Sequence, residues 1–289
     1  MRPSFPLLAP LGPTQLGPCV TCAALADDAT AAIKTFADRW DNRAVHVGCA
    51  CGGRSVATVA EHDGERQMPA AGVGKLALLL AGIRGHHAGT LDLTSRLRIS
   101  DLEPTREASP LDVLAEQREL GFHEILALGL LTDANPPFSL LFDVVGPQGP
   151  QTLGLEAVVS SRYGDIDLGS GVRAHRVSAR AASALLVNVV REATGVLYRL
   201  ALGLVNSTHT ARLVRDVDQL VLPGGFLVAN KIGTLGGVRN DVALYIAGDG
   251  ALVVSALSDD YPSGPLVDDE MASLGRELCA LRFGERENV

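Results

Sequence analysis

The stretch PAAGVGKLALLLA (residues 69–81) places a lysine at the start of a run of apolar residues. Residues 75–81 are apolar on nearly every side of a helix, which predicts a buried helix that ends near Gly85–Gly89. Of the 25 basic residues in the chain, only Lys34, Lys75 and Lys231 are lysine. Lysine can release a proton when its pKa is lowered, and arginine cannot. Lys75 is therefore a candidate functional amine, with a solvated surface lysine as the alternative.

The segments on both sides of this helix differ in their periodicity. Helical spacing of apolar residues predicts helices at Ala23–Trp40, Pro110–Ala115, Phe122–Leu131, Phe138–Val145, Ala179–Leu204 and Asp268–Leu281. Strands are predicted at Ala44–Cys51, Ser55–His62, Gly225–Asn230, Val238–Ala247 and Ala251–Leu257. Glycine turns at 52–53 and 248–250 would join two pairs of these strands into hairpins. The fold class is therefore α/β (α+β), with one antiparallel five-stranded sheet, terminal helices on one face and an all-helical lobe.

The order of these elements also predicts how the chain is divided. Residues 1–20 are rich in proline and glycine and form an irregular N-terminal arm. Residues 21–289 form a single domain, with a sheet lobe at about 21–68 and 221–289 and a helical lobe at about 69–220.

Composition narrows the possible partners. The formal net charge of −8 and the pI near 5.4 disfavour nucleic acid and membrane surfaces. No apolar run approaches the roughly 20 residues that span a bilayer, and the first residues lack the apolar core of a secretory signal. We therefore expect a cytoplasmic protein that acts on a small molecule, and the oligomeric state stays open.

The cysteines and histidines do not form a ligand pattern. Five cysteines include a CxxC at 19–22 and a CxC at 49–51, but no second ligand pair accompanies them, so ordinary thiols are expected. His86 and His87 follow the buried helix and are expected in solvent. No metal and no cofactor is predicted.

Two further motifs follow the lysine helix in the sequence. Asp133-Ala134-Asn135 lies between the two lysines, and Lys231-Ile232-Gly233-Thr234 is followed by GVRNDVA at 237–243. Lys75 and Lys231 are separated by 156 positions. Together with residues 69–81, these motifs resemble the Ser-x-x-Lys, Ser-Asp-Asn and Lys-Thr-Gly motifs of the class A β-lactamases and related penicillin-recognising serine enzymes. The resemblance covers nearly the whole chain after residue 20.

The resemblance implies a role for each matching residue. Gly72 stands at the position of the nucleophilic serine, and it cannot attack a carbonyl. This glycine can be a natural loss, a substitution introduced to trap a ligand, or simply a helix-entry glycine. Lys75 would be a base or proton relay in the cleft. Lys231 would bind a substrate carboxylate, or alternatively protect an edge strand. Gly233 and Thr234 would line the substrate-binding edge.

The middle motif departs from the family. Asp133 replaces a proton-shuttling hydroxyl, so beside two lysines it would be an ionised base or anchor; capping the following helix is the alternative. Asn135 would hold a substrate amide or the lysine, or would be only a turn residue before proline.

Two further positions differ from the hydrolytic enzymes. The loop that holds their deacylating glutamate matches Arg162–Leu168, which offers Gly164 or Asp165 and no glutamate. Ile232 replaces the hydroxyl residue of Lys-Thr-Gly. A serine restored at 72 can then give acylation without fast deacylation. Ser207-Thr208-His209 lies too late in the chain to be the Ser-x-Asn motif.

Three functions remain open. The leading hypothesis is a diverged β-lactamase-fold protein, an intracellular biosynthetic enzyme that performs non-covalent acid–base chemistry on a small acyl- or amide-containing metabolite. The alternative is a serine acyl-enzyme hydrolase or acyltransferase whose serine at 72 was replaced by glycine. The third is a catalytically inactive binding protein.

Overall fold

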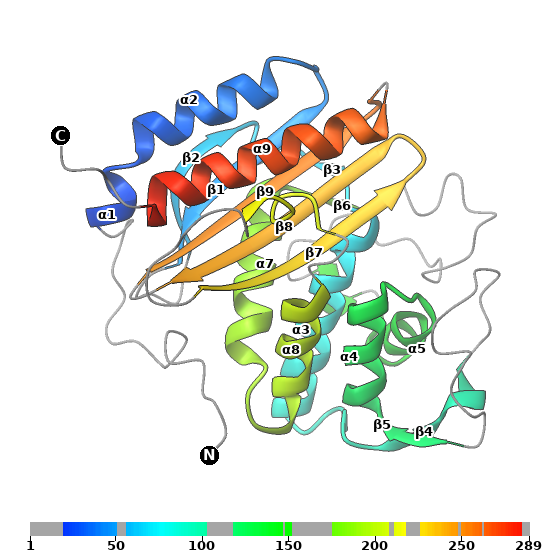
Figure 1. Cartoon of the computed structure of the whole chain (residues 1–289). Coiled ribbons are helices and arrows are strands. Elements are labelled where there is room, and N and C mark those ends of the chain that lie inside the picture. The colour runs from blue at the N-terminus through cyan, green and yellow to red at the C-terminus, as the bar shows by residue number, and fades with distance from the viewer. Residues whose placement is uncertain are drawn as a thin grey trace.

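The computed structural model describes residues 20–50, 56–102, 118–146, 148–151, 175–207, 211–217, 226–247, 250–261 and 263–284. A five-stranded antiparallel sheet in the order β2-β1-β9-β8-β7 crosses the molecule (Figure 1), which confirms the predicted sheet. Its strands are β1 Arg43–Cys49, β2 Ala57–His62, β7 Phe226–Leu235, β8 Val238–Ala247 and β9 Gly250–Asp259. Two short antiparallel pairs are β3 Met68–Pro69 with β6 Arg176–Val177, and β4 Arg96–Arg98 with β5 Glu119–Gly121.

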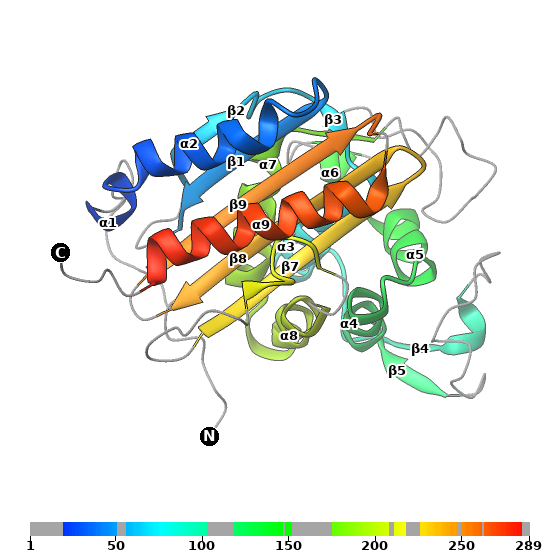
Figure 2. The same cartoon turned by 45° about the horizontal axis from the view of Figure 1, so that its top comes forward.

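Helices cover both faces of the sheet. The N-terminal helices and the C-terminal helix lie together on one face (Figures 1 and 2): α1 Val20–Ala23, α2 Ala26–Ala37 and α9 Gly264–Phe283. The helices that follow β3 in the chain lie on the other side: α3 Lys75–His87, α4 Phe122–Thr132, α5 Pro136–Val145, α6 Gln148–Gln151, α7 Ala179–Glu192 and α8 Tyr198–Asn206. Single 3₁₀ turns occur at η2 Ala71–Gly74, η3 Ile99–Asp101 and η6 Gly195–Leu197.

The sheet separates two hydrophobic cores. Successive strand residues point to opposite faces, so Val253 and Leu257 of β9 pack with α3 and α7, while Val254 and Ala256 pack with α2 and α9. The core on the α3 side also holds Leu76 and its neighbours in that helix. Helix α3 is therefore buried between the sheet and the other helices, as its sequence predicts.

Several predicted boundaries differ from the observed ones. The segment 179–204 is not one helix, because Gly195 takes a φ of +60° and begins a 3₁₀ turn between α7 and α8. The last predicted strand before the turn at Gly236 is longer than expected, because β7 pairs with β8 up to Leu235. The predicted helix Pro110–Ala115 lies outside the described residues, as does nearly all of the arm at 1–20.

A polar chain runs through the interior between the sheet and α7. His46 of β1 shares hydrogen bonds with Ser183 of α7 at 2.9 Å and Thr58 of β2 at 3.2 Å, and Ser183 contacts Ser255 of β9 at 2.7 Å. His46, Ser183 and Ser255 are fully buried. Burial lowers the pKa of His46 from 6.5 to about 4, so the ring is neutral at physiological pH.

His46 should make the protein sensitive to mild acid. Between pH 6.5 and 4 the unfolded chain binds a proton at this residue that the folded protein excludes, so stability falls as pH falls. The full difference corresponds to roughly 3 kcal/mol in the free energy of unfolding. Urea unfolding at pH 7 and pH 4.5 measures it, and His46→Gln should show a smaller loss between these pH values. An equal loss in both proteins would assign the acid sensitivity to other groups.

Candidate functional site

Three charged side chains from distant segments meet where α3 begins. The Lys75 Nζ donates to Asp133 Oδ1 at 3.2 Å, and the Lys231 Nζ donates to the same oxygen at 2.7 Å. Lys75 comes from the first turn of α3, Asp133 from the end of α4 and Lys231 from β7. The structure thus brings together three of the residues that the sequence motifs select, and we call them the ion triad.

The two lysines of the ion triad lie behind the aspartate. Each lysine side chain is 2% exposed, whereas the side chain of Asp133 is 36% exposed. Burial alone would raise the pKa of Asp133, but the ammonium groups of Lys231 and Lys75 outweigh burial and hold this pKa well below its usual range. The carboxylate is therefore ionised at neutral pH, and it is the member of the triad that solvent reaches.

The remaining lysine contacts are to main-chain oxygens and an aromatic ring. Lys75 Nζ also donates to the carbonyl oxygens of Asp133 at 3.2 Å and Ala134 at 3.4 Å, and it lies 4.9 Å from the centre of the Phe138 ring. Lys231 Nζ donates to the carbonyl oxygen of Ile232 at 2.8 Å. Each lysine Nζ therefore donates to main-chain oxygens as well as to the Asp133 carboxylate. The surface-lysine alternative for Lys75 is wrong, because its side chain is 2% exposed. Lys231 does lie on an edge strand, β7, but its side chain is 2% exposed and does not present a charge to solvent there.

Asp133 does not cap the helix that follows it. Its φ of +55° is left-handed and ends α4, and the residue that precedes α5 is Asn135. Neither the Asp133 carboxylate nor the Asn135 side chain bonds the first N–H groups of α5. Within the described part of the chain, Asp133 Oδ2 and the Asn135 amide have no hydrogen-bond partner.

Backbone occupies the space where a side chain at 72 would stand. A Cβ added to Gly72 would lie 2.7 Å from the Ile232 carbonyl oxygen and 3.3 Å from Lys231 Nζ. A Cβ on Gly233 would lie 2.9 Å from the nitrogen of Gly72. The turn η2 and strand β7 therefore touch backbone to backbone, and a side chain on either glycine would require the other backbone to shift. Ala71, just before Gly72, takes a φ of +46° that tightens this turn.

This contact predicts the effect of adding a single methyl group. Gly72→Ala should lower the free energy of unfolding by about 1–3 kcal/mol, because the nearest atom is a main-chain oxygen that cannot rotate away. Gly85→Ala in the helix that follows, α3, is the control, since its Cβ would make ordinary 3.4 Å contacts and should stabilise α3 by up to about 1 kcal/mol. Urea unfolding of both variants checks the pair, and a Gly72→Ala protein as stable as wild type would show that β7 gives way easily.

Two residues that support the site were not selected from the sequence. Asn240 is fully buried and donates its amide to the carbonyl oxygens of Pro69 at 2.7 Å and Ala70 at 3.1 Å, which holds the segment before Gly72. Arg212 donates to the Thr234 hydroxyl at 2.6 Å and to the Asn240 carbonyl oxygen at 2.9 Å. The polar Asn240-Asp241 pair in an apolar strand was the signal that could have pointed to Asn240.

The other residues selected from the sequence differ in their burial, and some of them lie outside the described residues. Gly233 is buried at the contact with η2, and Thr234 is exposed beside it on β7. Asp165 and the whole of Arg162–Leu168 lie outside the described residues. His87 is exposed as expected, but His86 is half-buried and accepts a hydrogen bond from a main-chain N–H of the following loop.

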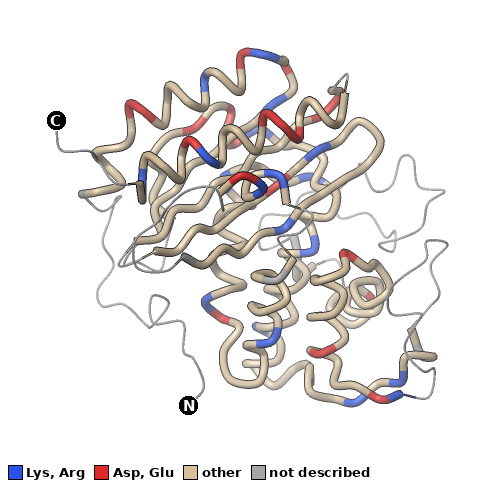
Figure 3. Tube along the Cα trace, viewed as in Figure 1, with Lys and Arg blue, Asp and Glu red and all other residues tan. Residues whose placement is uncertain are grey.

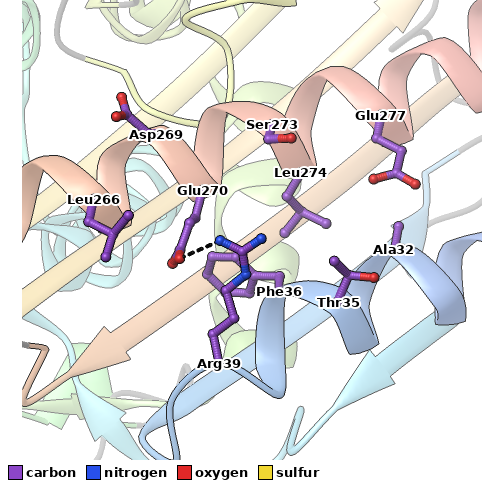
Figure 4. A pocket seen from close by; sticks show the side chains of 10 residues that line it. All are labelled: Ala32, Thr35, Phe36, Arg39, Leu266, Asp269, Glu270, Ser273, Leu274 and Glu277. Carbon is purple, nitrogen blue, oxygen red and sulfur yellow. Dashed lines mark hydrogen bonds and ion pairs between the residues drawn. The ribbon is translucent and has the colours of Figure 1, made fainter.

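A separate groove of about 220 Å³ lies between α2 and α9, on the opposite face of the sheet (Figure 4). Arg39 donates to Glu270 at 2.8 Å in this groove, and Arg43 binds the other carboxylate oxygen. Basic and acidic residues are interspersed along both helices (Figure 3). The carboxylate of Glu270 is therefore already neutralised, and the groove contributes nothing to the ion triad.

Among the described residues, no helix has the length and hydropathy of a membrane span.

The family model described as "Beta-lactamase enzyme family" matches residues 32–281. This match includes the sheet, α3 and all three members of the ion triad. The chain belongs to the β-lactamase enzyme family. The resemblance read from the three sequence motifs is thereby confirmed. No curated protein sequence matches the chain.

Solved structures with the same architecture include two β-lactamases and a PBP-A mutant. The β-lactamase from Sphaerobacter thermophilus DSM 20745 is 21% identical, with a TM-score of 0.69 over 89% of this chain and 97% of the other. A point mutant of PBP-A, solved as an acyl-enzyme complex with penicillin G, is 18% identical, with a TM-score of 0.66 over 92% and 97%. An ancestral (GNCA) class A β-lactamase is 19% identical, with a TM-score of 0.68 over 86% and 98%. These likenesses confirm the class A β-lactamase-like fold.

Proposed function

We propose that this β-lactamase-family protein binds a small acyl- or amide-containing metabolite without ever forming an acyl-enzyme. The observation that carries the proposal is the contact at Gly72, where the carbonyl oxygen of Ile232 lies 2.7 Å from the place of a Cβ. Position 72 has no hydroxyl group, and a side chain there would require the carbonyl oxygen of Ile232 to shift. Both features argue against a covalent intermediate on this residue.

The same contact favours a natural glycine over one introduced into an acylating enzyme. A protein that had evolved around a serine would keep room for that side chain, whereas here Gly72 and Gly233 pack against each other. Asp133 and Ile232 also replace hydroxyl residues of the family motifs, and a single introduced mutation would explain neither of them.

Ligand recognition would rest on the polar groups of the site that have no hydrogen-bond partner among the described residues. Asp133 Oδ2 offers an acceptor for an amide N–H or a hydroxyl, and the Asn135 side chain offers a donor and an acceptor. Both lysines are 2% exposed, whereas the Asp133 carboxylate that both of them contact is 36% exposed. This burial favours binding over proton transfer by either lysine.

Acid–base chemistry is the second candidate, and one observation favours it. The two ammonium groups share a single carboxylate oxygen, so one positive charge of the ion triad is not compensated by an anion within the triad. Such a cluster can supply a proton to a bound substrate. An intracellular biosynthetic role would belong to this second candidate.

Binding to matched small probes tests the proposal. N-acetylamino-acid amides should raise the melting temperature of the wild-type protein, and Asp133→Asn should weaken this effect because it replaces an acceptor with an amide. Nitrocefin should not be hydrolysed, and the intact mass should not change after incubation with penicillin G. A stable adduct with the mass of the opened lactam would refute the proposal.

Deuterium incorporation separates the two candidates. Proton transfer would exchange a carbon-bound hydrogen beside the acyl group of a bound probe for deuterium in D₂O, and NMR detects this exchange. Lys75→Arg keeps the charge but cannot release a proton, so it should abolish exchange while binding remains. Exchange that survives in Lys75→Arg would assign the proton transfer to another group, and no exchange in wild type would leave binding alone.

A further inference from the structure

We propose that Asp133 is a built-in anion: its carboxylate occupies, from within the chain, the place where Lys75 and Lys231 would otherwise bind an anionic ligand. Wild-type protein would then exclude carboxylates from the site and accept neutral hydrogen-bond donors at Oδ2. The statement about neutral ligands rests on the proposed function, whereas the occupancy by Asp133 does not.

The contacts of the two lysines identify Asp133 as an anion that both of them share. Each ammonium group has several oxygen acceptors, and the carboxylate that both of them contact is that of Asp133. The other hydrogen bonds of these ammonium groups include those to the carbonyl oxygens of Asp133, Ala134 and Ile232, which carry no net charge. A buried ammonium group without an anion is costly, so the carboxylate of Asp133 is what allows two lysines to lie here together.

The positions of the three charged groups leave the point between the two ammonium groups occupied. Asp133 Oδ1 lies within 3.2 Å of both Nζ atoms, so it fills the point at which the two cations converge. An incoming carboxylate would have to displace this group or lie against it, and two carboxylates in contact repel each other. A neutral amide N–H or hydroxyl meets no such repulsion and finds Oδ2 without a partner among the described residues.

The backbone conformation of Asp133 allows its side chain to be deleted by mutation, and this deletion tests the proposal. Its φ of +55° is a conformation that glycine adopts freely, so Asp133→Gly deletes the side chain without straining the turn. The deleted atoms, a methylene and a carboxylate, correspond to one acetate ion. Asp63 is a matched control position, since it also has a positive φ of 49° but is 51% exposed and forms only a 3.6 Å surface ion pair with Arg66.

Acetate rescue is the experiment. Asp133→Gly should melt at a lower temperature than wild type, and acetate should raise its melting temperature in a saturable way, while acetamide and an equal ionic strength of chloride should not. Wild type and Asp63→Gly should respond to acetate no more than to chloride. Asp133→Ser, which leaves a smaller space, should respond to formate more than to acetate.

Three results would overturn the proposal. The first is a wild-type protein that acetate stabilises as strongly as it stabilises Asp133→Gly. The second is a folded Asp133→Gly that does not respond to acetate. The third is a failure of both Asp133→Gly and Asp133→Ser to fold even with acetate in the buffer, because acetate is expected to restore the missing anion. None of these results concerns covalent adducts, so the proposed function stands or falls separately.

Discussion

Asp133→Asn should lower the free energy of unfolding at pH 7 by at least about 2 kcal/mol, because it leaves two buried ammonium groups without their anion. Removing one partner of a fully buried pair costs about 3–5 kcal/mol, and the partial exposure of Asp133 reduces this cost. Asparagine has nearly the same size and tolerates the left-handed backbone at this position, so the change isolates the charge.

Lys75→Met should cost less than half as much. It leaves Lys231 and Asp133 as a one-to-one ion pair at 2.7 Å, and a methionine side chain suits the ring of Phe138 nearby. Urea unfolding of both variants measures the two costs under the same conditions. If Lys75→Met were the more damaging change, the carboxylate would not be holding two cations in place, and the charge balance assigned to the ion triad would be incorrect.

The fold was predictable because its signals are local and repeated. The apolar run after Lys75 predicted a buried helix, and the β-prone segments that form β8 and β9, joined by a glycine turn, predicted a hairpin of the sheet. The break between α7 and α8 was missed, because apolar spacing continues through it and the positive φ of Gly195 becomes apparent only in three dimensions.

The meeting of the three charges was predictable in part. Two of the three lysines fell on motif positions, and Asp133 lay in the expected place between them. Sequence spacing could not show that both lysines would share one oxygen, since this depends on where α4 ends and how β7 lies against α3. It also could not show which member of the triad solvent reaches.

The contact between Gly72 and β7 was not predictable. A missing serine is visible in the sequence, but the loss of its space depends on a carbonyl oxygen of Ile232, which carries no signal in the side-chain pattern. The hydrogen bonds from Asn240 to the segment before Gly72 were not predictable for a similar reason, because their acceptors are main-chain oxygens 170 and 171 positions away.

Gly72→Ser should remain unable to form an acyl-enzyme, which revises the expectation that a restored serine would be acylated. Its Cβ would collide with the Ile232 carbonyl oxygen, so the hydroxyl cannot take up its place unless β7 moves. Lys75 Nζ already donates to three oxygen acceptors and is poorly placed to accept the serine proton. Asp133, with its pKa held well below its usual range, is a weak base.

The most direct measurement is the intact mass of folded Gly72→Ser after incubation with penicillin G, with an acylating class A β-lactamase variant treated in parallel and circular dichroism to show that the protein is folded. We expect the mass of Gly72→Ser to be unchanged while the parallel sample gains the mass of the opened lactam. A stoichiometric adduct on the serine at position 72 would contradict the central claim, because it would show that the cleft still accommodates a nucleophile and that only the missing hydroxyl prevents acylation.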